Sequence, residues 1–277
     1  MRDVGGVLHI RIRTLGSRAL GIDVSAYLVG DLLIDTGFAY VREPVLRALR
    51  DHRISVICCT HNHEDHTGNA AALARIHGCP VYLRHAEQLW EEGVEDLAPY
   101  RLTWWGRVEP FSPLEMPETV ESGGRRLRAV PAPGHSSTQT ALFDEASGDV
   151  FTGDLFVSPG ATAVLNWANP WEEAMSLRRV AALGPRRMLT GHGLIIDDPA
   201  AVLKLKASRI EEAARRSVEM AAAGVPPRRI VRKVFPRGRS KDRFLEFLTS
   251  RQFSRFNFVQ AAVRLAPPGA GPAIVQH

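Results

Sequence analysis

The stretch "THNHEDH", residues 60–66, places three histidines and two acidic residues within six consecutive positions. The nearly all-apolar run "ISVICCT" leads directly into it and predicts a short strand that is covered on both faces. Residues two apart in an extended segment point to the same side, so His61 and His63 can bind one cation together. Asp65 and His66 lie where the chain turns into a helix and can face a second cation. Imidazole and carboxylate ligands without thiolates suit zinc, manganese or iron.

Four ligands cannot complete two metal sites, so the rest of the chain should supply more. Three candidates each end a strand-like run: His135 in "PAPGHSST", Asp154 in "FTGDLF" and His192 in "LTGHG". Each of them alone would be an ordinary turn residue beside glycine, and only their shared context favours a ligand role. The side chains of Asn62 and Glu64 point to the alternate face of the first segment, which favours solvent exposure or structural hydrogen bonding.

With these candidate ligands, the sequence resembles the metallo-β-lactamase-fold hydrolases, and among them the glyoxalase-II-like branch of metallo-hydrolases. "THNHEDH" matches the HxHxDH signature, "PGHS" the histidine of the third motif, "GDLF" the bridging aspartate, "TGHG" the last histidine and "LIDTG" an upstream motif. The resemblance covers roughly residues 7–196. It implies an α/β (α+β) fold, a four-layer αβ/βα sandwich with a two-metal centre at the edge of its paired sheets, followed by a C-terminal helical addition.

The resemblance also implies a division of labour around two divalent metal ions, with zinc expected first and manganese or iron as alternatives. His61, His63 and His135 would hold the first ion, Asp65, His66 and His192 the second, and Asp154 would bridge them. A water shared by two such ions is a hydroxide near neutral pH and would be the nucleophile. Asp65 would be the catalytic residue that orients this water and carries a proton to the leaving group. Asp35 of "LIDTG" resembles the family aspartate that fixes the tautomer of a ligand histidine without touching the metal, with a capping role in the turn as the alternative.

The composition is that of an ordinary globular protein, with 277 residues of which 45% are apolar and 23% charged. No apolar run reaches the ~18 residues of a membrane-spanning helix, and the N-terminus has no signal-peptide core. We therefore expect a cytoplasmic location and no membrane partner. Three cysteines without CxxC spacing argue against a disulfide framework and against a cysteine-built zinc site.

Charge divides the chain into two parts. Residues 201–277 contain 16 Lys and Arg against 5 Asp and Glu, a net charge of +11, whereas residues 1–200 contain 19 against 25, a net charge of −6. Strand-like and helix-like runs alternate in the first part and predict a catalytic domain over residues 1–198. A basic helical segment is expected over residues 199–265, and a flexible Pro/Gly-rich tail over residues 266–277.

Two substrate classes compete, because this fold supports several reactions. The first is a small acyl compound, a thioester slightly ahead of a lactone, with glutathione or coenzyme A as the thiol. The helical C-terminal segment resembles the substrate-binding addition of the glyoxalase-II-like branch. The alternative is a metal-dependent ribonuclease or phosphodiesterase, in which the basic segment binds RNA. The same basic residues could bind phosphates of coenzyme A or carboxylates of glutathione, or form a solvated helix face.

Aromatic residues in irregular stretches favour an apolar substrate pocket. They are Trp104 and Trp105 in the loop "LTWWGRV", and Phe156 and Trp167 after Asp154. Loop packing is the alternative for each, and a homodimer contact is a further alternative for "LTWWGRV". Six phenylalanines between residues 235 and 258 could stack RNA bases, but their spacing favours helix cores.

Overall fold

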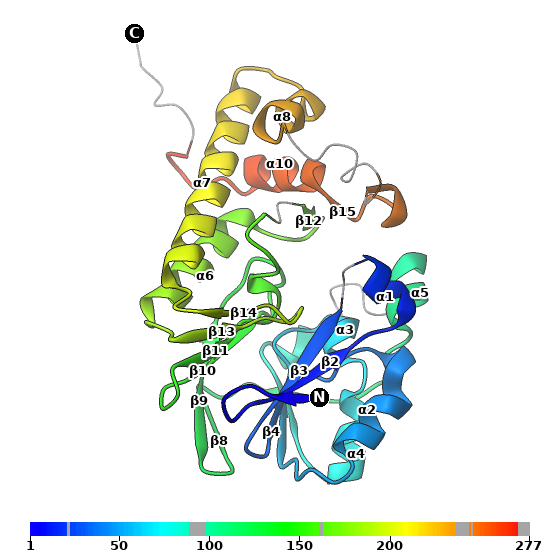
Figure 1. The fold of residues 1–277 in the computed structure, drawn as a ribbon. Coiled ribbons are helices and arrows are strands. Elements are labelled where there is room, and N and C mark those ends of the chain that lie inside the picture. Colours follow the sequence, from blue (N-terminus) through cyan, green and yellow to red (C-terminus); the bar gives the residue numbers. More distant parts are fainter. Residues whose placement is uncertain (21–22, 89–97, 161–162, 237–243, 245, 271–277) are drawn as a thin grey trace.

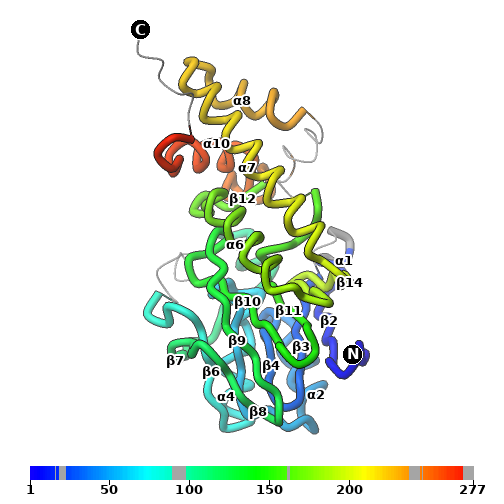
Figure 2. The backbone as a smooth tube through the Cα atoms, turned by 90° about the vertical axis from the view of Figure 1, so that its left-hand side faces the viewer, coloured from blue at the N-terminus to red at the C-terminus, as the bar shows by residue number. Residues whose placement is uncertain are grey.

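Two β-sheets pack face to face, and helices cover the outer face of each sheet (Figure 1). This computed structural model describes residues 1–20, 23–88, 98–160, 163–236, 244 and 246–270. The four layers confirm the predicted αβ/βα sandwich. Helices that follow the sandwich in sequence gather at one end of the molecule (Figures 1 and 2).

The first sheet has seven strands that neighbour one another in sequence order. They are β1 Arg2–Asp3, β2 Leu8–Ile12, β3 Val24–Val29, β4 Leu32–Ile34, β5 Val56–Cys58, β6 Val81–Leu83 and β7 Leu114–Glu115. Pairing is antiparallel from β1 to β4 and parallel from β4 to β7. The parallel part places the chain segments that follow β4 and β5 at the same edge of the sheet.

The second sheet has six strands in the order β14-β13-β11-β10-β9-β8. They are β8 Thr119–Ser122, β9 Arg125–Pro131, β10 Thr140–Asp144, β11 Asp149–Phe151, β13 Arg187–Leu189 and β14 Ile195–Asp197. Only β11 and β13 pair in parallel, and the other neighbours are antiparallel. Segments that follow β11 and β13 therefore also share one edge.

Eight helices of the described residues lie before residue 160 and cover the sheets or close the loops between strands. They are α1 Leu15–Leu20, η1 Ala39–Val41, α2 Arg42–Leu49, α3 Glu64–Thr67, α4 Ala70–His77, η2 Ala86–Gln88, α5 Pro99–Trp105 and η3 Gly153–Leu155 among the described residues. Residues 99–105 were expected to be a loop, and the helix there begins with Pro99 in its first turn, where a missing N–H costs nothing. Helix α4 ends at Gly78 in the left-handed conformation, as its sequence predicts.

Alternation along β4 shows how the sequence builds the layers. Leu32 and Ile34 belong to the apolar cluster between the two sheets, together with Leu142 and Phe151 of the second sheet. Leu33, between them in sequence, belongs to the cluster between the first sheet and its helices. All three side chains are buried, which explains why the strand reads as continuously apolar.

The C-terminal helices share an apolar core with the second sheet and its helix α6 Pro170–Ala182. They are α7 Ala200–Ala222, α8 Pro227–Val234 and α10 Arg255–Arg264. Trp171 of α6 donates its indole N–H to the Ala262 carbonyl of α10, at 2.9 Å. A two-stranded sheet of β12 Val164–Leu165 and β15 Phe253–Ser254 adds a further connection. The division at residue 198 stays a prediction.

The phenylalanines at this end of the molecule differ in burial. Phe235 and Phe258 are buried, as expected for most of these residues, whereas Phe244 and Phe247 are 58% and 80% exposed and do not pack in a core. Across the described residues, none of the helices combines the length and apolar character needed to cross a membrane.

Candidate metal centre

All seven predicted ligands meet at the edge where β5, β11 and β13 end. His61 and His63 follow β5, Asp154 lies in η3 after β11, and His192 follows β13. The carboxyl ends of parallel strands commonly form binding sites because the following loops converge there. The ligand atoms fall into two groups, and within each group they lie within 4.8 Å of one another. The histidine group comprises His61, His63 and His135, and the carboxylate group comprises Asp65, His66, Asp154 and His192.

The histidine group brings three ring nitrogens to one point. His61 Nε2 and His135 Nε2 each lie 3.0 Å from His63 Nδ1. Burial lowers the pKa of all three imidazoles, so they are neutral near pH 7. A neutral imidazole has one N–H and one lone pair. Because two of the rings approach the same nitrogen of the third, the three rings cannot all satisfy their hydrogen-bonding atoms with one another. Their converging lone pairs are the arrangement that a zinc-type cation requires.

The carboxylate group combines opposite charges. His66 Nε2 lies 3.3 Å from Asp154 Oδ1 and 3.6 Å from Asp65 Oδ2. Burial opposes protonation of His66, but the carboxylates around it outweigh this effect and raise its pKa well above the usual value. His192 behaves alike, since Asp154 raises its pKa to about 9 against the effect of burial. These imidazoles lower the pKa of the buried Asp154 well below its ordinary range.

Asp154 lies between the two groups. Its Oδ1 faces His66, while its Oδ2 lies 3.2 Å from His192 Nε2 and 3.6 Å from His135 Nε2. Within the described residues, His66 Nε2 and Asp154 Oδ1 are buried without a hydrogen-bond partner. Buried polar atoms without partners are costly, and a cation between them would remove this cost. The donor set therefore fits two divalent cations that share one carboxylate.

Asp35 fixes the orientation of His66 from behind. Its Oδ2 lies 2.8 Å from His66 Nδ1, and its carboxylate also accepts hydrogen bonds from the Thr60 backbone N–H at 2.7 Å and hydroxyl at 2.9 Å. The Asp35 backbone has a φ of +57°, uncommon for a residue with a side chain and often found at functional sites. Because Asp35 occupies Nδ1, the Nε2 atom of His66 remains directed at Asp154.

The first sheet supports the loop that carries His192, although this loop follows a strand of the second sheet. The carbonyl of Asp23 lies 2.9 Å from His192 Nδ1, and the Tyr27 hydroxyl donates to the Thr190 carbonyl at 2.7 Å. Ser25 donates its backbone N–H to the Gly191 carbonyl, and its hydroxyl lies 2.9 Å from His9 Nε2. These supporting residues could not be predicted from the sequence, because they are distant in sequence from every ligand motif.

Gly191 is required beside the carboxylate group. A Cβ atom at this position would lie 2.5 Å from Asp154 Oδ1 and 2.7 Å from the His66 ring. Neither neighbour can move without disturbing a candidate ligand. The glycine of "TGHG" therefore reflects a close approach of the backbone to the ligands.

Asn62 and Glu64 are fully buried, so the expectation of structural hydrogen bonding is confirmed and that of solvent exposure is wrong. Asn62 Oδ1 accepts a hydrogen bond from the Ser136 hydroxyl at 3.0 Å, which holds the loop of His135. Glu64 forms two hydrogen bonds with Arg101 of α5. The alternate face of the signature thus anchors two neighbouring segments.

The four aromatic residues expected in a substrate pocket lie in different surroundings. The ring of half-buried Trp167 lies 5.9 Å from that of His63. Trp105 is buried against Phe38, at 4.9 Å, and Phe156 is fully buried. Trp104 packs edge-on against Tyr100 of the same helix. Trp167 is thus the member of this set that contacts a candidate ligand ring in the described structure, and a pocket role for the four stays a prediction.

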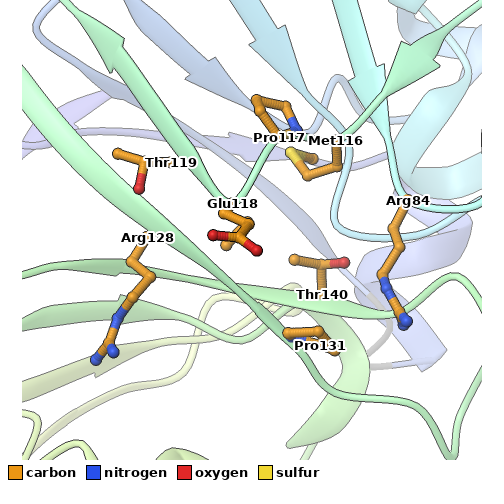
Figure 3. Close-up of a pocket in the computed structure, with 9 residues that line it drawn as sticks. Arg84, Met116, Pro117, Glu118, Thr119, Arg128, Pro131 and Thr140 are labelled. Carbon is orange, nitrogen blue, oxygen red and sulfur yellow. The ribbon is translucent and has the colours of Figure 1, made fainter.

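A separate pocket of about 340 Å³ opens between the edges of the two sheets (Figure 3). Arg84, Glu118, Arg128 and Thr140 are among its lining residues, with the Glu118 side chain between the two arginines. None of the seven candidate ligands lines it. The pocket contributes no ligand to the metal centre.

Comparison with known proteins places this geometry in a family. Residues 20–192 match the model of the metallo-beta-lactamase superfamily. The chain belongs to the metallo-β-lactamase superfamily. A beta-lactamase domain protein from Burkholderia ambifaria has the same fold, with a TM-score of 0.71, 21% identity, and coverage of 96% of this chain and 86% of that one.

Two curated relatives, both named as enzymes, resemble the chain over part of its length. An atrochrysone carboxyl ACP thioesterase of Aspergillus fumigatus is 32% identical over 187 residues, which cover 63% of this chain and 52% of the relative. A hydroxyacylglutathione hydrolase of Alkalilimnicola ehrlichii is 33% identical over 165 residues, which cover 58% of this chain and 55% of the relative. The chain therefore spans about half the length of these relatives.

Proposed function

We propose that the chain is a metal-dependent hydrolase that cleaves a small acyl thioester. The observation that carries this proposal is the pair of adjacent ligand groups joined by Asp154. Two divalent ions bound there would supply a water of lowered pKa as the nucleophile and polarise the acyl carbonyl. Zinc is our first expectation for both ions, with manganese or iron as alternatives, since the same donors accept all three.

The protein residues around such a centre would have distinct tasks. Asp65 Oδ2 lies 3.6 Å from His66 Nε2, so its carboxylate would lie beside a water at the centre, hold it by a hydrogen bond and accept its proton. Transfer of that proton to the departing sulfur would complete hydrolysis. Asp35 would keep His66 in one tautomer throughout, because its carboxylate occupies Nδ1.

Thioesters are preferred to lactones because both curated relatives described above are named for thioester chemistry. The thiol part would be glutathione, coenzyme A or the equivalent arm of a carrier protein. The net charge of +11 in residues 201–277 supports an anionic thiol part, since phosphates and carboxylates pair well with arginine. A cytoplasmic location and a homodimer stay predictions.

A ribonuclease remains the second candidate, favoured by one specific observation. The basic residues Arg228, Arg229, Arg232 and Lys233 of α8 are exposed, and so are Phe244 and Phe247 nearby in sequence. Exposed cations and aromatic rings together suit a single-stranded nucleic acid. Charge reversal of the four basic residues should then reduce both RNA binding and its salt dependence, and unchanged binding would exclude this candidate.

The deciding experiment measures thiol release from acyl-glutathione and acyl-coenzyme A thioesters by metal-loaded protein. Asp65→Asn should abolish most of the release while keeping the fold. Asp51→Asn, at an exposed carboxylate after α2, is the matched control and should leave release unchanged. No release by protein that contains about two metal equivalents would overturn the thioesterase proposal and make single-stranded RNA the next substrate to test.

A further inference from the structure

A buried ion pair attaches helix α5 to the metal-binding signature. Arg101 donates from Nε to Glu64 Oε1 at 2.6 Å and from Nη2 to Glu64 Oε2 at 2.5 Å. Glu64 is fully buried and Arg101 is 6% exposed. Burial of two charges is costly and is offset only by good geometry, so such a pair contributes orientation more than stability. The planar guanidinium provides this geometry, since both hydrogen bonds have to form together.

The same guanidinium packs on an aromatic ring beside the metal centre. Arg101 Cζ lies 5.4 Å from the ring centroid of Trp167, within the range of a cation–π contact. Trp167 in turn lies edge-on to His63 of the histidine group, at 5.9 Å. Arg101 thus connects three segments: the signature, helix α5 and the loop between β12 and α6.

Helix α5 is fixed at its other end by the apolar core. Trp105 packs on Phe38 at 4.9 Å, and Trp104 packs against the same core cluster. Arg101 is therefore the polar attachment of a helix that is otherwise held by aromatic packing. Because Glu64 neutralises its charge, Arg101 offers no free cation to a carboxylate or phosphate on a substrate.

We propose that Arg101 is a positioning residue that sets acyl selectivity: anchored by Glu64, it holds Trp167 as a neutral aromatic wall beside His63. Such a wall favours a bulky apolar acyl group over a small one, since aromatic side chains contribute large apolar contact areas. The inference rests on the proposed thioester hydrolysis and adds the class of acyl group to it.

The test compares benzoyl-coenzyme A and decanoyl-coenzyme A with acetyl-coenzyme A in metal-loaded wild-type and Arg101→Lys protein. Lysine keeps the charge but loses the second hydrogen bond and the flat face over Trp167. We expect KM for the two bulky substrates to rise about ten-fold, which corresponds to ~1.4 kcal/mol. The kcat values, the constants for acetyl-coenzyme A and the bound metal should stay within about two-fold of wild type.

Arg75→Lys is the matched control, because Arg75 forms the same kind of two-bond pair with Glu109 at the protein surface. It should change none of these constants. Equal changes for bulky and small substrates, loss of metal, or no change for any substrate in Arg101→Lys would each overturn the inference.

Two further measurements keep the inference testable on other grounds. Trp167→Phe should retain most of the selectivity and Trp167→Ala should lose it, even if Arg101→Lys does not fold. Binding of S-decyl-coenzyme A, a thioether that cannot be hydrolysed, should weaken about ten-fold in Arg101→Lys by calorimetry. Absence of thioester cleavage by wild type would refute the proposed function, whereas unaltered thioether binding would refute the aromatic wall.

Discussion

The two ligand groups lie side by side but differ in electrostatic character. The histidine group consists of neutral imidazoles whose pKa values are lowered by burial. The carboxylate group balances charge among its own members, because Asp154 raises the pKa of His192 and both His192 and His66 lower that of Asp154. Asp154 is the carboxylate that also approaches the histidine group, through His135. A positive charge in the histidine group therefore has to be balanced largely by the neighbouring carboxylate group.

Removal of Asp154 should produce the largest effect, since it eliminates the shared charge. We expect Asp154→Asn to bind at most about one metal equivalent and to lose more than a hundred-fold in hydrolysis, beyond the 10–100-fold typical of residues that only support a ligand. Elemental analysis and thiol release would measure both effects. Asp149→Asn is the control on β11, the strand that precedes Asp154, where the carboxylate pairs with Arg187 instead. Two equivalents retained by Asp154→Asn would show that the groups bind independently.

A pair of single substitutions should separate the two groups. His135→Ala removes one of three ligands from the histidine group, and His192→Ala removes one ligand from the carboxylate group. We expect each variant to retain about one equivalent of metal, because each leaves the other group complete and Asp154 in place. Competition with a chelator would measure the affinity of the remaining ion. Loss of both ions from either variant would show that the two groups bind cooperatively.

The seven residues singled out in the sequence converge in the structure because chemistry restricts their spacing, and their role as metal ligands stays a prediction. His61, His63, Asp65 and His66 are specified by a short segment that joins a buried strand to a helix, so local geometry alone brings them together. The sequence also predicted a helical segment from residue 199, where α7 is found. Two-residue strands such as β12 and β15 were missed, since pairing over such a length depends on tertiary contacts.

The partners of the site could not be predicted for a related reason. Arg101 meets Glu64 across 37 positions, and Tyr27 meets Thr190 across 163. Nothing in a single sequence marks such pairs, because each residue alone has an ordinary surface or core role. Helix α5 was also missed, since the many prolines around it argued for irregular structure and its aromatic residues suggested a loop.

A medium effect should follow from Asp35, whose direct contact with a candidate ligand is the one with His66 of the carboxylate group. We expect Asp35→Asn to weaken metal binding there by about 10–100-fold, because His66 loses the carboxylate that orients it. The histidine group should keep its affinity within about three-fold. Chelator competition followed by elemental analysis distinguishes the two ions. Equal weakening of both ions would indicate that Asp35 stabilises the whole edge of the sheet.

The smallest effect is expected for His9, which supports the loop that carries His192. Through this loop His9 is linked to the carboxylate group alone. Burial, assisted by Arg2 and Arg11, lowers the pKa of His9 from 6.5 to about 4. Below pH 6.5 the unfolded chain therefore binds a proton that the folded chain does not, and folding stability from this residue falls until about pH 4. Glutamine at position 9 can still reach Ser25 but does not titrate. When the pH falls from about 6.5 to about 5, the unfolding free energy of His9→Gln should therefore decrease by about 1–2 kcal/mol less than that of wild type.

Urea unfolding of metal-free protein at several pH values measures this difference without a contribution from metal release. His52→Gln is the control, at a half-buried histidine near the end of α2, and should retain the wild-type pH dependence. Identical slopes for His9→Gln and wild type would mean that His9 is protonated equally in the folded and unfolded chains. Its place between Ser25 and the His192 loop would then contribute packing alone, and the electrostatic contrast between the two groups would end at the ligands themselves.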